Sequence, residues 1–188
     1  MYNLNQDCKP SINKNFLRNC SHRPKSGILR KWIGFSDGID QAATNVTKSA
    51  AAGMDSKFHF DQFVLGANSF LYRIEGNDKV HKVKHEFQEG DFVNGYIHTD
   101  SVTFIDRNQT VLMNLADMSD GRFFTISEMV DPSGDGMSKF LVAGAFSGMK
   151  MISNTFDSGE NAGTMPVELA TKENQLEPYG VLPIVLDD

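Results

Sequence analysis

Four histidines are the side chains of this sequence best suited to chemistry, because neutral imidazole is a common metal ligand. They are His59, His81, His85 and His98. His81 and His85 are four residues apart, which brings side chains together on a helix but leaves them two steps apart along one face of a strand. No cysteine or carboxylate stands beside them at zinc-ligand spacing, so we expect no metal site.

A second candidate is the acidic segment 131–136, whose pattern Asp-x-Ser-x-Asp-Gly resembles the start of a calcium-binding loop. The twelfth position of such a loop should be Glu, but here it is Val142. The same residues are typical of a tight turn, which is the interpretation we adopt. The Gly-x-Ser-x-Gly, HExxH, P-loop and Gly-x-Gly-x-x-Gly motifs are absent from the sequence, so we expect neither an enzyme nor a bound cofactor.

The segment 121–154 organises the rest of the chain, because its pattern predicts three short strands. Residues 123–130 are rich in aromatic and β-branched side chains. Residues 139–145 and 149–154 follow as the second and third strands, with a reversal at Ser147-Gly148. A meander of three strands cannot bury its apolar face alone, so we expect the rest of the chain to supply a second layer.

Other segments are candidates for that layer. Trp32 lies in a candidate strand and is expected to anchor the core. Apolar residues recur at helical spacing over 106–120, and Gly121 suits a left-handed position at the end of this helix. Residues 36–54 remain open between helix and loop. The expected strands outside the meander are one over 27–35, two within 57–75 that break at residues 66–68, and one over 165–171, before an apolar tail at 181–186.

The longest β-like stretch is a hairpin over residues 79–105, with its turn near 89–91 or at Asn94-Gly95. Its first arm has two faces, one with His81, Val83, His85 and Phe87, the other with Val80, Lys82, Lys84 and Glu86. The second face is mostly charged, so we expect it to meet water or a neighbouring subunit. A long hairpin also leaves an edge that must be paired or protected, and a ring of subunits would pair it.

Charge is distributed unevenly along the chain, which has a formal net charge of -6. Residues 1–35 hold seven Lys or Arg and one Asp, whereas residues 36–188 hold eleven Lys or Arg and 23 Asp or Glu. A basic arm can bind nucleic acid or dock on an acidic neighbouring subunit, and the scarcity of interleaved aromatics favours docking. We therefore expect an extended basic arm, 1–35, followed by one β-rich domain, 36–188.

The first residues of the chain lack the apolar core of a signal peptide, so we do not expect secretion. No apolar run approaches the roughly 20 residues that a membrane-spanning helix needs. Cys8 and Cys20 could pair, but free thiols are the expected state of two cysteines in an intracellular chain.

Four motifs follow one another over residues 58–171: a hairpin that ends in YIHTDSVTF, one helix, the strand GRFFTISEM, and the closing segment KFLVAGAFSGMKMISNTFDSGENAGTMPVELATKE. In this order they resemble the tail tube proteins of tailed bacteriophages, particularly phages of Bacteroidetes-type hosts. Residues 140–151 and 157–169 follow that family's pattern of strand, glycine turn, strand, Asp/Gly-rich loop and last strand. Residues 1–56 lie outside the resemblance.

The resemblance implies a mainly β fold, a β-sandwich or partial barrel with a long hairpin and one short helix. Members of this family form hexameric rings that stack into a tube, and double-stranded DNA passes through its lumen in transient, non-specific contact. The implied partners are other copies of this chain, the tape-measure protein and other tail proteins. The implied location is the virion tail, after assembly in the host cytoplasm and without a membrane.

Two sets of residues are candidates for these contacts. Self-assembly is expected to use Lys79, Lys82, Lys84, Glu86, Tyr96, His98 and Thr103. The arm between rings is expected to use Lys14, Arg18, Arg23, Lys25 and Arg30. The lumen in this family tends to be acidic, in agreement with the acidic balance of residues 36–188.

Three other functions remain open from the sequence. The chain could form another ring of a phage tail, such as a terminator, connector or neck component. It could be the tube protein of a contractile injection system, which carries no DNA. It could also be a monomeric β-sandwich binding module, for example for glycans, which predicts exposed aromatics on loops; Tyr72, Tyr96 and Tyr179 do not cluster in the sequence.

Overall fold

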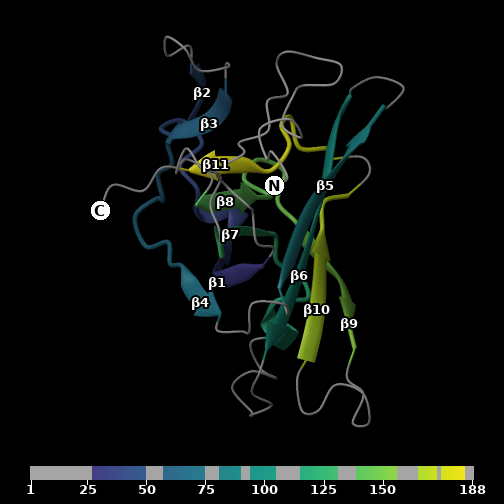
Figure 1. Ribbon diagram of the computed structural model, residues 1–188. Coiled ribbons are helices and arrows are strands. Elements are labelled where there is room, and N and C mark those ends of the chain that lie inside the picture. Colours follow the sequence, from purple (N-terminus) through teal and green to yellow (C-terminus); the bar gives the residue numbers. More distant parts are fainter. Residues whose placement is uncertain are drawn as a thin grey trace, which may run out of the picture.

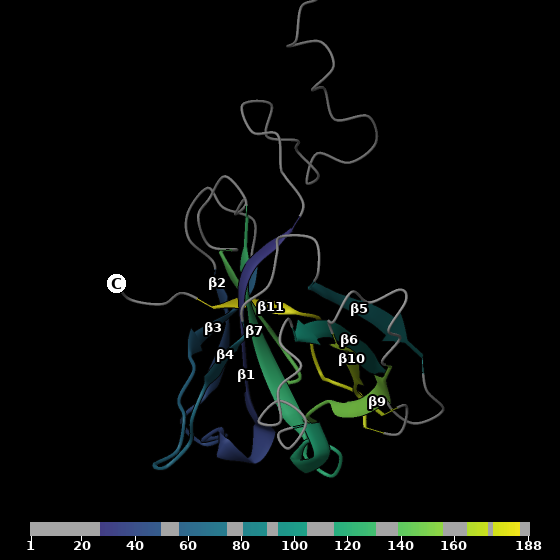
Figure 2. The ribbon, with the colours of Figure 1, turned by 90° about the horizontal axis from the view of Figure 1, so that it is seen from below.

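The computed structural model describes residues 27–49, 57–74, 81–89, 94–104, 115–130, 139–155, 165–172 and 175–184. Eleven strands within these residues form one sheet of seven strands and one of four. The protein is therefore mainly β, as the sequence predicts. Figure 1 and Figure 2 show the two sheets as separate layers that pack against each other as a sandwich.

The seven-stranded sheet has the order β2-β3-β11-β8-β7-β1-β4. Only β11 and β3 run parallel among its neighbouring strands. Its members are β1 (Ile28–Phe35), β2 (Asn45–Ser49), β3 (Lys57–Gln62), β4 (Tyr72–Ile74), β7 (Phe123–Met129), β8 (Phe140–Ala143) and β11 (Leu182–Ile184). Central strand β7 is buried along nearly its whole length, which means that both faces of this sheet are covered.

The four-stranded sheet has the order β5-β6-β10-β9, and all its neighbouring strands are antiparallel. Its members are β5 (Lys82–Gln88), β6 (Gly95–Phe104), β9 (Lys150–Asn154) and β10 (Met165–Ala170). β5 and β6 form the long hairpin expected from the sequence. Gln88 lies opposite Gly95, so residues 89–94 make the connection.

The main core lies between the two sheets. β1, β4, β7 and β8 contribute to it from the large sheet, and β6 and β10 from the small one. Residues 115–117 are helical, and Leu115 and Met118 also pack into this core. The preceding part of the predicted helix, 106–114, lies outside the described residues. The best-buried strand members of the core include Ile33, Val102, Phe123, Ala143, Val167 and Leu169.

A second apolar cluster covers the other face of the large sheet. It joins Phe60, Phe124, Ile126 and Val142 with the C-terminal strand β11. The predicted core anchor Trp32 lies half-buried against this cluster, with its ring centroid 6.0 Å from that of Phe140. The large sheet thus has an apolar core on each side, which is why few of its strands show a simple alternation of polar and apolar residues.

The predicted meander over 123–154 is wrong in its third strand. β7 and β8 pair as expected, but β9 joins the four-stranded sheet and pairs with β10. Gly144 and Gly148 both have a φ of 73°, a left-handed conformation that glycine adopts without strain. These two residues carry the chain from one sheet to the other, so the glycine turn is a crossover instead of a hairpin.

Three further expectations need correction. Ile28–Phe35 is a strand of the large sheet, between β7 and the edge strand β4, so this part of the expected arm belongs to the body, while residues 1–26 lie outside the described residues. Residues 36–54, for which the sequence did not decide between helix and loop, contain a short 3₁₀ turn at Ser36–Gly38 followed by strand β2. Gly121 does not have a positive φ; a side chain there would instead meet the ring of Phe123 at 2.5 Å.

Candidate self-assembly surface

The four-stranded sheet ends in two open edges, β5 and β9, among the described residues. Because its strands alternate in direction, β5 and β9 run in opposite directions. An unpaired edge presents free backbone N–H and C=O groups and is a template for pairing with another chain. Such a sheet can therefore be continued from either edge by another copy.

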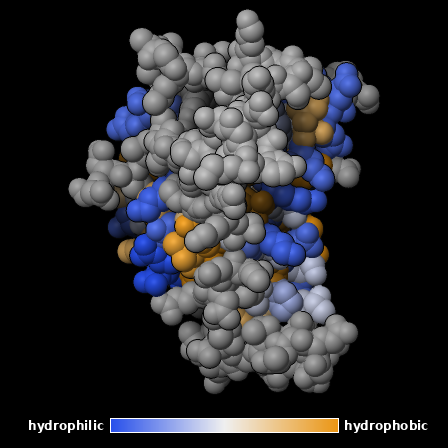
Figure 3. Space-filling model, in the orientation of Figure 1, coloured by the Kyte–Doolittle hydropathy of each residue, from blue (hydrophilic) through white to orange (hydrophobic). Residues whose placement is uncertain are grey.

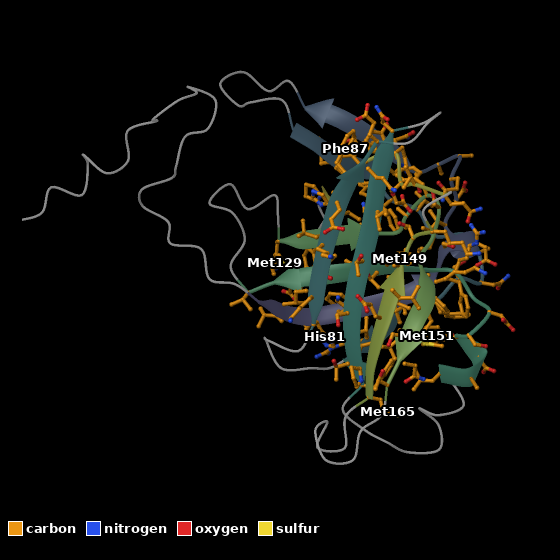
Figure 4. The ribbon with its side chains drawn as sticks, turned by 90° about the vertical axis from the view of Figure 1, so that its right-hand side faces the viewer. His81, Phe87, Met129, Met149, Met151 and Met165 are labelled. Atoms are coloured by element: carbon orange, nitrogen blue, oxygen red, sulfur yellow. The ribbon has the colours of Figure 1, made fainter. Side chains whose placement is uncertain are left out.

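Each of these two edges exposes one large apolar side chain. Phe87 near the end of β5 is 60% exposed, and so is Ile152 in the middle of β9. Figure 4 shows Phe87 and His81 at opposite ends of β5. The ring of Phe87 contacts that of Tyr96 edge-on at 5.5 Å but leaves most of its surface in solvent. A single exposed apolar side chain is common on protein surfaces, so these edges are candidates for pairing because their strands are open.

The outer face of the small sheet carries mostly polar side chains. On β5 it carries Lys82, Lys84 and Glu86, and Lys84 forms an exposed ion pair with Glu86 at 3.2 Å. The register places Ser101 opposite Lys82 and Glu168 opposite Ser101, so charges of both signs flank a row of hydroxyls. Hydrophobic side chains also reach the surface among hydrophilic ones on the face of the molecule in Figure 3.

A buried ion pair fixes the small sheet to the large one. Lys31 of β1 and Asp100 of β6 are both 0% exposed, and their side chains form a salt bridge in the middle of the sandwich. Thr125 of β7 donates a hydrogen bond to the same carboxylate, and the Lys31 ammonium also donates to the carbonyl oxygen of Lys82 at 3.2 Å. Burial raises the pKa of Asp100 and lowers the pKa of Lys31, and their mutual attraction opposes both shifts.

A buried histidine links β6 to the crossover and to the C-terminal segment. The backbone N–H of Gly144 donates to Nδ1 of His98 at 2.9 Å, so the ring proton must lie on Nε2, which contacts the carbonyl oxygen of Tyr179 at 2.9 Å. Both ring nitrogens of neutral His98 therefore have a hydrogen-bond partner. Burial lowers the pKa of His98 to about 4, which keeps this ring neutral near pH 7.

A buried carboxylate holds the crossover itself. Glu177 is 1% exposed and accepts hydrogen bonds from the backbone N–H groups of Phe146 at 3.1 Å and Ser147 at 2.8 Å. Its own backbone pairs with Tyr96 of β6 through two hydrogen bonds. Burial raises the pKa of Glu177, and the backbone N–H donors oppose that shift. Glu177 thus ties the β8–β9 crossover, the C-terminal segment and β6 together.

A cleft of about 650 Å³ opens at the start of β5. Ile28, Val83 and Met129 give it an apolar floor, Lys82 and Lys84 lie at its side, and the buried His81 lines it. His81 accepts a hydrogen bond from the backbone N–H of Thr103 through Nδ1 at 3.3 Å. Its Nε2 has no partner among the described residues. Burial lowers the pKa of His81 to about 4, and nearby Lys31 lowers it further.

A second hollow of about 510 Å³ lies beside β4, at the edge of the large sheet. Phe35, Phe70 and Tyr72 line it, and each is between 43% and 66% exposed. The left-handed Asn68, with a φ of 73°, turns the chain between β3 and β4 and leaves Phe70 on the surface. This edge of the large sheet thus exposes a second set of aromatic side chains.

The predicted assembly residues fall into different environments. Lys82, Lys84 and Glu86 are exposed on the outer face of β5, and Lys79 lies outside the described residues. Tyr96 is half-buried, whereas His98 and Thr103 are buried. Burial of His98 and Thr103 within one copy leaves little of either side chain for a neighbouring copy to contact.

Of the predicted arm residues, only Arg30 is described. It lies on β1 and makes a two-point contact with Glu128 of β7 through its guanidinium group. Lys14, Arg18, Arg23 and Lys25 lie outside the described residues. Arg30 therefore joins β1 to β7 within the large sheet. The prediction of an arm between rings then concerns the other four residues.

Sequence reasoning missed the residues at the two edges. Nothing in the sequence indicated that Ile152 would be exposed, because an isoleucine in a predicted strand is usually buried. Phe87 lies on the predicted face that it shares with His81, but His81 is buried whereas Phe87 is 60% exposed. The ion pair of Lys31 and Asp100 could not be predicted either, since 69 residues separate the two in the sequence.

No protein family, curated protein or solved structure was found to match this chain. Within the described part of the chain, no three His, Cys, Asp or Glu side chains come together as a potential metal site. The described residues also include no helix of the length and apolar character that crossing a membrane requires.

Proposed function

We propose that this protein is a structural virion subunit, a phage tail tube protein that assembles into stacked rings around a channel for DNA. The observation that carries this proposal is the four-stranded antiparallel sheet, whose two edge strands run in opposite directions and have no further partner strand among the described residues. The order of motifs over residues 58–171 supports it independently.

An even number of alternating strands favours ring closure. A rotation about an axis along the strands brings β9 of one copy beside β5 of the next, and the two strands are then antiparallel. Every further copy repeats the same contact, and a heterologous interface of this kind closes into a ring. Closure leaves no edge. Six copies, the number implied by the resemblance, give a barrel roughly 40–50 Å across at the backbone.

The outer face of the small sheet suits the wall of a DNA channel. Its other face packs on the large sheet, so in a closed barrel the large sheet lies outside and this face inside. The short hydroxyl side chains of Thr99 and Ser101 lie on this face, where Glu86 and Glu168 offset two of the three lysines Lys82, Lys84 and Lys150. A net charge this small gives the phosphate backbone little attraction, which lets DNA pass.

The proposal is tested by placing a charge on each open edge. Ile152→Lys and Phe87→Lys alter exposed side chains, so each variant should fold normally but block edge pairing. Leu29→Lys is the control, because this exposed residue lies on β1 in the large sheet. We expect the unmodified protein and the control to form rings or tubes in electron micrographs, and both edge variants to sediment as monomers.

Two results would count against this function. If the wild-type protein stays monomeric at every concentration, it does not form rings and the proposal fails. Rings that form equally well in both edge variants would show that another surface makes the contact. Single rings that never stack would favour a terminator or neck component over a tube.

A further inference from the structure

The two edge strands of the small sheet each carry one large apolar side chain that a single copy leaves exposed. Phe87 lies near the end of β5 and Ile152 lies in β9. The proposed ring places β9 of one copy beside β5 of the next, so the edge contact could bury both side chains. They meet only if one strand is shifted along the other by the right number of residues.

The tilt of the strands in a closed barrel determines the size of this shift, because strands tilt by about 35–45° from the axis. Four strands of one copy span about 19 Å, so a tilt of about 35° shifts the next copy by about 14 Å along the strands, which is about four residues. The shift must be an even number, since an odd one would place inner side chains opposite outer ones. Shifts of two and six residues correspond to roughly 19° and 47°, outside the usual range.

The right-handed twist of β-strands determines the direction of the shift, because it makes the strands of a barrel coil around the axis in a right-handed sense. Figure 4 looks onto the face of the small sheet that the proposed ring turns toward the channel, with Phe87 above His81 at the left and Met151 of β9 at the right. Seen from the channel, right-handed strands lean to the left as they rise. The copy beyond β5 is therefore shifted upward along the strands, from His81 toward Phe87.

This shift places Phe87 opposite the bulge of β9. The cross-strand pairs of one copy put Met151 at the level of Val83 and on the same face of the sheet. Phe87 is four residues beyond Val83 on that face, so it lies opposite Met151 of the neighbouring copy. The bulge of β9 adds one residue at this position, and that residue is Ile152.

We propose that Phe87 of one copy packs against Ile152 and Met151 of the neighbouring copy, and that this contact fixes the register of the ring. The inference rests on the proposed function. Backbone hydrogen bonds alone leave a pair of edge strands free to slip by two residues, whereas the apolar contact forms at one register only. Each copy contributes Phe87 on one side and Ile152 on the other, so the partner is a second copy of this chain.

Disulfide cross-linking measures the shift. In a background with Cys8→Ser and Cys20→Ser, Glu86→Cys is combined with Ser153→Cys, two exposed positions of the outer face that a shift of four residues places opposite each other. We expect mild oxidation of the assembled protein to give a ladder of covalent oligomers, since bridged Cβ atoms must lie about 3.5–4.5 Å apart. The matched control is Lys82→Cys with Ser153→Cys, a pair that the shift separates by about 14 Å and that should give no ladder.

A double-mutant cycle tests the contact itself. Phe87→Ala and Ile152→Ala shorten exposed side chains, so we expect each variant to fold and to raise the protein concentration needed for assembly roughly tenfold. The double variant should raise it little beyond the larger single effect, because either substitution removes the same contact. Leu29→Ala is the control, since this exposed residue of β1 lies in the large sheet and its loss should leave the concentration unchanged.

The outcomes separate this inference from the proposed function. A ladder from the Lys82 pair instead of the Glu86 pair would overturn the shift but leave the ring intact. A ladder from the Glu86 pair, together with effects of Phe87→Ala and Ile152→Ala that simply multiply, would overturn the packing contact. Rings with neither ladder would overturn the pairing of β9 with β5. A protein that never assembles would overturn both the contact and the proposed function.

Discussion

The buried pair of Lys31 and Asp100 gives the sharpest prediction for stability. Lys31→Met removes the ammonium but leaves the Asp100 carboxylate in a fully buried site, where Thr125 is its remaining hydrogen-bond partner among the residues that the structure describes. Breaking a buried ion pair in this way costs about 3–5 kcal/mol, because one charge stays uncompensated. For a chain of this length, that loss lowers the melting temperature by roughly 6–20 °C.

The assay is chemical denaturation of dilute protein, followed by the fluorescence of Trp32, the single tryptophan, which lies next to Lys31 on β1. Lys82→Met is the matched control, since Lys82 is exposed and its loss should change stability by less than about 0.5 kcal/mol. Replacing the whole cluster, with Lys31→Met, Asp100→Leu and Thr125→Val, removes the charge and should recover most of the loss.

Two results would refute this reasoning. A cost below about 1 kcal/mol for Lys31→Met would mean that the carboxylate finds solvent or takes up a proton without penalty. A triple variant as unstable as the single one would mean that the cluster matters for its shape and packing, not for its charge.

Three further predictions concern the groups that fix the crossover between β8 and β9. His98 should lower the free energy of unfolding by up to about 3 kcal/mol as the pH drops from 6.5 to about 4, because its imidazole takes up a proton there in the unfolded chain but not in the folded one. The pKa of His81 is also lowered to about 4, so His81 contributes over the same range, and His98→Gln should remove roughly half of the combined fall in denaturation curves. Glu177→Gln should cost about 1–3 kcal/mol in the same assay, because its amide group cannot accept from both backbone N–H groups, whereas Glu86→Gln on the surface should be neutral. Gly144→Ala should lower the melting temperature, because its φ is 73° and its Cβ would lie 2.8 Å from the carbonyl oxygen of Phe123, while Gly66→Ala, with its nearest atom at 3.6 Å, should not. Equal melting temperatures for the two glycine variants would contradict the proposed role of Gly144.

Local signals in the sequence were sufficient for most strands. The aromatic and β-branched run at β7, the alternation of β10 and the long β5–β6 hairpin all appear where their composition predicts them. The reason is that each of these strands carries its own pattern over several residues. Strand β11 was read only as an apolar tail, since it is three residues long and has Pro183 at its centre.

Pairing between distant segments could not be predicted in the same way. A turn with Gly148 at its end fits a hairpin as well as a crossover. The crossover depends on contacts with distant residues, such as those that Phe146 and Ser147 make with Glu177 about 30 residues later. Lys31 resembles any exposed lysine of a strand until Asp100 and Thr125 are placed beside it. The exposed Phe87 and Ile152 likewise depend on which strands become edges, a property of the whole sheet.

The most direct test of the proposed assembly is a cryo-electron microscopy reconstruction of the protein at high concentration. We expect a closed ring in which β5 of each copy lies antiparallel to β9 of the next, with the outer face of the four-stranded sheet toward the channel. A reconstruction in which the hairpin of β5 and β6 touches no other copy, or in which the large sheet lines the channel, would contradict it.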